Sequence, residues 1–136
     1  GTDKQAVMIH RSTIGSLVRI FAFLTEHYGG AFPLWLSPVQ VMVIPVGETQ
    51  LDYAKNVGDS LRKVGIRAEI DESNEGLGKK VRAAKVTKIP YYLVVGAKEV
   101  GSNTVTVEHR DKGKIGEQTI ADLIVDLQKV IVEKTL

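Results

Sequence analysis

Basic side chains gather in one short stretch of this 136-residue chain. Residues 76–98 contain six lysines and arginines and no acid, although the formal net charge of the whole chain is only +2. The six are Lys79, Lys80, Arg82, Lys85, Lys88 and Lys98. The preceding residues 48–75 hold seven acids and four bases, so the charge is unevenly distributed. The stretch produces a strongly positive local field, which attracts phosphate groups.

Two polar residues flank this stretch, and each allows two interpretations. Asn74 follows Asp71, Glu72 and Ser73, where it serves turn formation or presents its amide to the edge of a nucleic-acid base. Glu99 follows Lys98 and is either a local salt-bridge partner or an acceptor for the amino group of a base. Composition leaves both pairs of alternatives open.

No catalytic motif is present in the later part of the chain. It contains no phosphate-binding Gly-Lys-Ser/Thr loop, no Gly-x-Ser-x-Gly elbow and no dinucleotide fingerprint. Asp71 ends a predicted strand, as a phosphoacceptor would in a receiver-like domain, but the acidic pair that would hold magnesium is absent. The chain has no cysteine, and its three histidines lie far apart, which favours structural roles over a metal site.

The elements that position these residues follow from hydrophobic periodicity. Tyr91–Val95 is continuously apolar, as expected of a central strand covered on both faces, so Lys98 and Glu99 should emerge at its carboxyl edge. Strands that alternate with helices predict a three-layer α/β domain with a mixed, mostly parallel sheet. The predicted strands are 39–46, 67–71, 91–95 and 104–109, the last two joined by a hairpin, and the predicted helices are 49–64, 77–88 and 119–133.

The first thirty residues follow a different pattern. A strand is predicted at Lys4–His10 and a helix at 11–28, with apolar residues around nearly its whole circumference. Such a helix should be buried on several sides or pair with a second copy. The prolines and Trp35 that follow indicate an ordered linker, which predicts two parts, 1–36 and 37–136. No apolar run is long enough to cross a membrane, and we expect a cytoplasmic protein.

Several motifs of the chain resemble those of a known family. The motifs Val7–Arg11, Ile14–Arg19 and Leu24–Gly30 are similar to motif 3 of class II aminoacyl-tRNA synthetases, specifically the threonyl-tRNA synthetases. The match continues through Trp35–Pro45 and Ile89–Val100. The resemblance implies a strand and helix from a catalytic domain, followed by a class IIa anticodon-binding domain.

The resemblance also implies roles for particular residues. His10 matches a zinc ligand whose partner ligands lie upstream of this chain, and Arg19 matches the motif 3 arginine that contacts ATP. Asn74 and Glu99 match residues that read anticodon bases. Glu108 stands where related chains place an anticodon-reading arginine, and Arg110 is the candidate to replace it. The full set of expected tRNA contacts is Asn74, Lys79, Lys80, Arg82, Glu99 and Arg110.

The implied parent is a homodimeric threonine-tRNA ligase that uses zinc, and ATP with magnesium. We expect the present chain to be a piece of it that binds the anticodon stem-loop of threonine tRNA. By itself the chain should be inactive and hold no cofactor, because motifs 1 and 2 and the other zinc ligands are missing. The alternative is a stand-alone α/β protein-interaction or receiver-like module that does not bind RNA.

Overall fold

The computed structural model describes residues 1–135, and the chain divides into two compact units, Gly1–Gly30 and Ala31 onward. In the first unit, residues 1–16 form no regular element. The strand predicted at Lys4–His10 is therefore wrong for this chain. A strand needs a neighbouring strand to pair its backbone groups, and every strand pair in the described residues lies between Val41 and Thr119.

Helix α1, Leu17–Tyr28, is the only regular element in the described part of the first unit. It ends at Gly29, whose φ of 55° is the left-handed conformation that glycine adopts easily. The predicted helix ends at the same residue but began too early. No residue of α1 is buried, and Phe21 and Phe23 are 59% and 65% exposed. The apolar surface of α1, which the sequence predicts to be buried, is therefore exposed to solvent in this unit.

A five-stranded sheet forms the centre of the second unit, in the order β2-β1-β3-β4-β5. Strands β1, β2 and β3 are parallel, whereas β4 is antiparallel to both β3 and β5. The predicted mixed sheet is confirmed, with Tyr91–Val95 as its central strand. The strands are β1 Val41–Pro45, β2 Ala68–Ile70, β3 Tyr91–Val95, β4 Thr104–His109 and β5 Gly113–Thr119.

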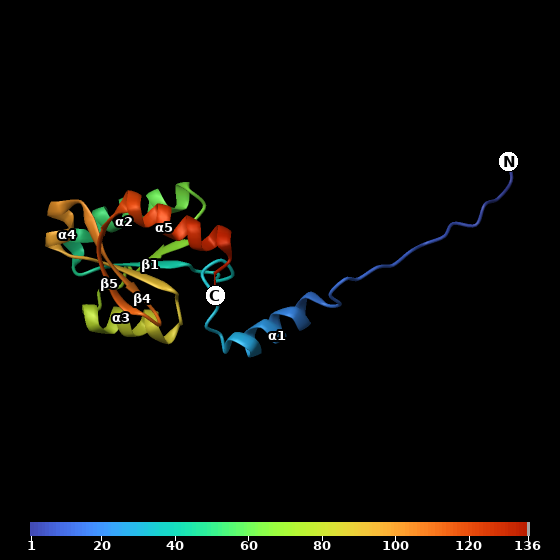
Figure 1. Ribbon diagram of the computed structural model, residues 1–136, viewed down its shortest axis with the longest axis horizontal. Helices are drawn as coiled ribbons and strands as arrows, with labels where there is room; N and C mark the ends of the chain where they lie inside the picture. The colour runs from blue at the N-terminus through green and yellow to red at the C-terminus, as the bar shows by residue number, and fades with distance from the viewer. Residues whose placement is uncertain (136) are drawn as a thin grey trace. The chain divides into compact units, whose positions relative to one another are not determined.

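Helices cover the two faces of this sheet unequally (Figure 1). Helices α2, Leu51–Lys63, and α5, Ile120–Glu133, lie on one face and enclose the larger core, which includes Val57, Leu93 and Leu127. Helix α3, Leu77–Val86, packs on the other face against Ile44 and Tyr92. This gives the three predicted layers. None of these helices could span a membrane, nor could any other helix within residues 1–135.

Two elements differ from the prediction. The predicted hairpin between β3 and β4 contains a short helix, α4, Ala97–Ser102, and strand β5 was not predicted. Helix α4 has only six residues and no apolar stripe. Strand β5 is a largely exposed edge strand that pairs with β4 alone, and it carries a bulge opposite Val107 and Glu108. Both lack the apolar periodicity from which elements are inferred.

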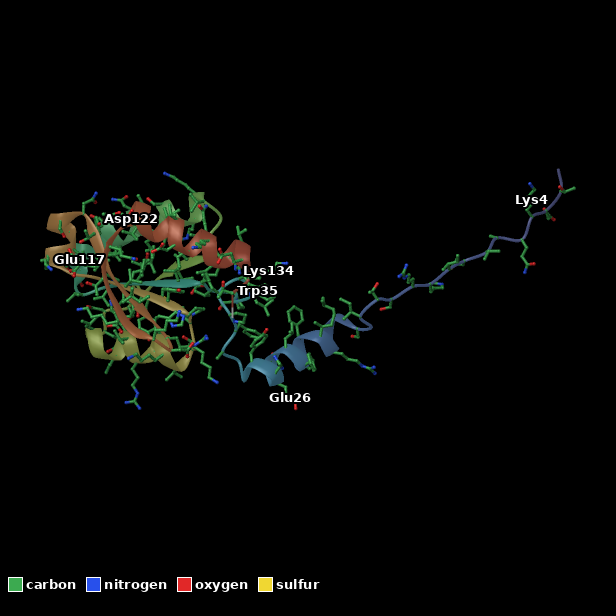
Figure 2. All side chains as sticks on the ribbon, viewed as in Figure 1. Lys4, Glu26, Trp35, Glu117, Asp122 and Lys134 are labelled. Carbon is green, nitrogen blue, oxygen red and sulfur yellow. The ribbon has the colours of Figure 1, made fainter. Side chains whose placement is uncertain are left out.

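The linker before β1 is fastened to the second unit by hydrogen bonds. Arg67 donates to the carbonyl oxygens of Trp35 and Ser37 at 2.7–3.1 Å, and Gln40 Nε2 donates to the Leu34 carbonyl at 2.8 Å. Leu34 itself lies in the core. Lys134 lies 5.9 Å from the Trp35 ring centre (Figure 2). Residues 31–36 thus pack with the later domain, while the origin of the first unit in a catalytic domain remains a prediction.

Deleting residues 1–30 should leave the second unit folded with an unchanged free energy of unfolding, because neither core cluster contains a residue before Leu34. Urea denaturation of both chains measures this. Burying each large side chain of α1 contributes ~1.5–3 kcal/mol, so the full chain should dimerise through α1 and the deletion variant should be monomeric in light scattering. A lower unfolding midpoint for the deletion variant, or a monomeric full chain, would contradict this view.

Candidate nucleic-acid interface

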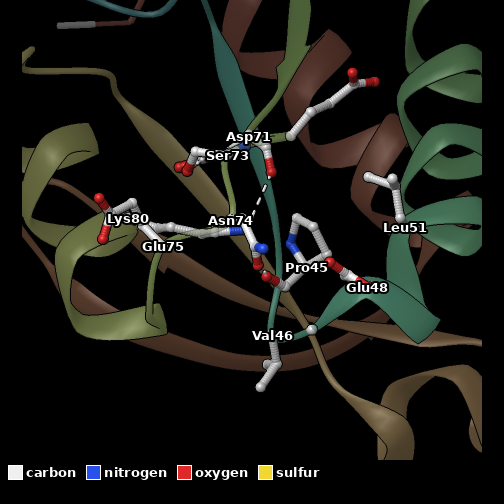
Figure 3. A pocket seen from close by; sticks show the side chains of 11 residues that line it. Pro45, Val46, Glu48, Leu51, Asp71, Ser73, Asn74, Glu75 and Lys80 are labelled. Atoms are coloured by element: carbon white, nitrogen blue, oxygen red, sulfur yellow. Dashed lines mark hydrogen bonds between the residues drawn. The ribbon is translucent and has the colours of Figure 1, made fainter.

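A cavity of about 290 Å³ opens at the carboxyl ends of β1 and β2 (Figure 3). In open α/β sheets this edge is the usual place for a ligand. Its walls come from the end of β1, the start of η1 (Glu48–Gln50) and α2, and the loop that joins β2 to α3. We call it the carboxyl-edge pocket; its lining residues are Pro45, Val46, Gly47, Glu48, Leu51, Asp71, Glu72, Ser73, Asn74, Glu75 and Lys80.

Lys80 lies in the wall of this pocket rather than on the surface. It is only 5% exposed, and its Nζ donates to the carbonyl oxygens of Pro45 and Asp71, each at 3.3 Å. These two oxygens belong to the ends of neighbouring strands, so the ammonium joins them (Figure 3). Lys80 was expected to contact phosphate. In this structure it instead shapes the edge of the sheet, because α3 turns its side chain inward.

Asn74 lies on the exposed loop between β2 and α3 and lines the pocket. The loop is shaped by Asp71, whose Oδ1 accepts a hydrogen bond from the Ser73 backbone N–H at 3.0 Å, an ordinary Asx turn. The lining residues include four carboxylates and one ammonium, Lys80. Two of the carboxylates form ion pairs with lysines outside the lining, Glu72 with Lys55 and Glu75 with Lys79. Four carboxylates minus three ammonium groups leave one negative charge. Such a pocket suits the amino and imino donors of a base and disfavours a phosphate.

Glu99 occupies the first turn of α4, which directly follows β3. Its Oε2 accepts from the backbone N–H of Gly96, and its Oε1 accepts from Thr106 Oγ1, both at 2.9 Å. Partial burial raises the pKa of Glu99, but the hydrogen bonds from Thr106 and Gly96 outweigh it and leave the pKa below its usual value. Glu99 therefore caps its own helix. It forms no salt bridge in the described residues, and the salt-bridge interpretation is wrong.

Glu117 of β5 fastens α4 to the sheet, and sequence reasoning missed it. Its carboxylate accepts hydrogen bonds from Lys98 Nζ at 2.7 Å, Thr104 Oγ1 at 2.6 Å and Ser102 Oγ at 3.1 Å. These hydrogen bonds, led by that from Lys98, lower the pKa of Glu117 to about 2. The network holds α4 in place beside the edge, and Glu99 with it. No local pattern links Glu117 to Lys98, because β5 itself was not predicted.

Comparison with known families identifies this arrangement of sheet, pocket and α4. Residues 40–130 match the model of the family described as anticodon binding domain. The chain belongs to the anticodon binding domain family. The matched range holds β1 to β5 and most of α5, so the whole carboxyl-edge pocket lies in the anticodon-binding domain.

The individual relatives are tRNA ligases. The chain is 46% identical, over 98% of its length, to a threonine–tRNA ligase of Synechococcus elongatus, of which it covers 22%. The crystal structure of the RNA-binding domain of threonyl-tRNA synthetase from Cryptosporidium parvum matches with a TM-score of 0.81 and 34% identity, over 88% of this chain and 30% of that one. Prolyl-tRNA synthetase of the same organism gives 0.66 and 28%, over 74% and 23%. The resemblance to threonyl-tRNA synthetases is confirmed.

The remaining expected contacts of the anticodon-binding domain lie in different surroundings. Lys79 and Arg82 are exposed on α3, and Lys79 Nζ lies 2.9 Å from Glu75 Oε2. Arg110 is instead only 15% exposed in its side chain. It donates to the carbonyls of Ala31, Phe32 and Lys88 and to Asp111. Its guanidinium is thus occupied by acceptors of the protein itself, so Arg110 holds the linker rather than replacing an arginine at position 108.

His10 and Arg19 lie in the first unit, and both side chains are exposed. Within residues 1–135, no group of three or more histidine, cysteine, aspartate or glutamate residues is placed to hold a metal ion. One histidine does not make a zinc site. The residues of this chain therefore do not fit bound zinc by themselves, and no chemical step is assigned to it.

Replacing Arg110 with alanine should lower the free energy of unfolding by about 2–3 kcal/mol, because hydrogen bonds to charged groups contribute more than neutral ones and three backbone carbonyls lose their donor. Urea denaturation measures the change. Arg82→Ala is the matched control and should stay within about 0.5 kcal/mol of the unaltered chain, since Arg82 is exposed. If Arg110→Ala unfolded like the control and lost only RNA binding, Arg110 would be a tRNA contact after all.

Proposed function

We propose that this chain recognises the anticodon of threonine tRNA as part of a threonine-tRNA ligase. The observation that carries the proposal is the carboxyl-edge pocket, in which an exposed amide and an acidic lining stand at the ligand-binding edge of an anticodon-binding domain. The 46% identity to a threonine–tRNA ligase supports threonine as the amino acid. The alternative of a module that does not bind RNA has no comparable support.

Recognition of the bases falls to the edge of the sheet. The bases of an RNA loop are unpaired and present their hydrogen-bonding edges to a protein. The Asn74 amide both donates and accepts, so it can pair with such an edge. Glu99 already accepts two hydrogen bonds, but a carboxylate has about four acceptor sites. It can therefore cap α4 and accept from a base amino group at the same time.

The backbone of the RNA is contacted by other residues. Lys79 and Arg82 are exposed on α3 and supply positive charge without base preference. Lys80 acts indirectly in this proposal, because its ammonium is committed to the carbonyls of Pro45 and Asp71. Arg110 is left out of the set of tRNA contacts for the same kind of reason.

The parent enzyme, in this proposal, is a homodimer that activates threonine with ATP and magnesium and esterifies it to tRNA. The chain spans about a fifth of the relative from Synechococcus elongatus. Its anticodon-binding domain would select the tRNA, while Arg19 would contact ATP and His10 would join zinc ligands from outside this chain. The chain alone would bind RNA without catalysis.

The test compares RNA hairpins that carry a threonine anticodon or a changed one. Asn74→Ala should reduce the affinity ratio between them by ~10-fold, since removing a hydrogen bond to a base edge costs ~1–3 kcal/mol of discrimination. Lys79→Ala should weaken both hairpins equally, because phosphate contacts carry no sequence information. Gln128→Ala, which removes an exposed amide on α5, is the matched control and should change neither value. Fluorescence anisotropy titrations give the affinities.

Two outcomes would overturn the proposal. One is a full chain that fails to bind RNA at any salt concentration, as expected of the protein-interaction alternative. The other is a full chain that binds both hairpins equally, with Asn74→Ala indistinguishable from Gln128→Ala. A loss of discrimination in Lys79→Ala together with an unaffected Asn74→Ala would exchange the roles assigned to these two residues.

A further inference from the structure

A row of side chains crosses the sheet on the face that α3 partly covers, at the end away from the carboxyl-edge pocket. Lys85 Nζ lies 5.9 Å from the centre of the Tyr92 ring. Tyr92 pairs with Glu108 of β4, and Glu108 pairs with Lys114 of β5. Paired residues on neighbouring strands share one face of a sheet. Lys85 and Lys114 therefore flank the same row, with two strand spacings, ~10 Å, between the backbones of Tyr92 and Lys114.

One further cation, Arg82, belongs to the same region. Arg82 precedes Lys85 by three residues on α3, so both lie on one side of the helix. Lys112, in the turn between β4 and β5, lies instead with Tyr91 and Val130 on the face that α5 covers, and is left out. The side chains of Arg82, Lys85 and Lys114 are exposed. We define the amino-edge patch as Arg82, Lys85 and Lys114.

The amino-edge patch keeps a positive excess after its acidic neighbours are counted. Helix α3 itself contains no acid. Glu108 lies opposite Lys114, and Asp111 forms an ion pair with Arg110 at 3.1 Å, so that these two cancel. Three cations minus Glu108 leave two positive charges. The carboxyl-edge pocket keeps an excess of one negative charge when its ion pairs are counted in the same way, so the two ends of α3 are opposite in charge.

We infer that the amino-edge patch binds the sugar–phosphate backbone of the RNA whose bases enter the carboxyl-edge pocket, an inference that rests on the proposed function. An acidic pocket repels phosphates, and a basic patch attracts them. Helix α3 has ten residues and is therefore about 15 Å long. The phosphates held at the patch belong to nucleotides that flank those read at the pocket, and the RNA runs along α3.

The test measures how the affinity for the threonine-anticodon hairpin changes with salt concentration. In the full chain carrying Lys85→Ala and Lys114→Ala, the slope of log affinity against log salt should become shallower by ~0.7–0.9 for each phosphate that is no longer neutralised. The affinity ratio between cognate and changed hairpins should stay the same. The matched control carries Lys63→Ala and Lys129→Ala, two exposed lysines on α2 and α5, and should keep the slope of the unaltered chain. Thermal melting should be alike for all three chains.

An unchanged slope in the patch variant would overturn this inference. An equal reduction of the slope in the control would also overturn it, because it would indicate diffuse attraction of the RNA to the whole protein. If the unaltered chain still distinguished the hairpins in either case, the proposed function would stand without the patch. A chain that bound all hairpins alike would overturn the proposed function, and the slope of the patch variant would still decide whether the backbone contact exists.

Discussion

The buried ammonium of Lys80 is the interaction on which the candidate interface depends. It joins the carbonyls of Pro45 and Asp71 at the ends of two parallel strands and so sets the start of the loop that carries Asn74. A buried charge is costly unless it is hydrogen-bonded, so both carbonyl oxygens must stay directed at Lys80 Nζ. These two hydrogen bonds preorganise the pocket.

A second set of polar contacts fixes the other side of the edge. Glu117 holds α4 through Lys98, Ser102 and Thr104, and Glu99 caps that helix from within. These two carboxylates thus support the fold beside the carboxyl-edge pocket. The exposed basic surface lies along α3 and β5. In the proposed function, base reading and backbone binding therefore occur on separate surfaces of one domain.

Sequence patterns predicted the parts of this domain that have apolar periodicity. The bounds of β3 and β4 agree with the prediction, because buried β-branched and aromatic residues mark both. The pattern could not find α4 or β5, whose stability comes from hydrogen bonds between distant residues such as Lys98 and Glu117. The sequence pattern also could not separate Lys79 from Lys80. The two residues are adjacent and chemically identical, and only the orientation of α3 leaves the first exposed and the second buried. Arg110 looked like a ligand-binding cation for the same reason, since its carbonyl acceptors lie up to 79 residues away.

The central claim is that RNA bases are read at the carboxyl-edge pocket. NMR chemical-shift mapping of the ¹⁵N-labelled chain with a threonine-anticodon hairpin tests it most directly. The account predicts large shifts for the Asn74 side-chain amide and for the backbone of residues 71–75, and markedly smaller ones when the anticodon is changed. Shifts concentrated on α2 and α5, or identical shifts at Asn74 with both hairpins, would contradict it.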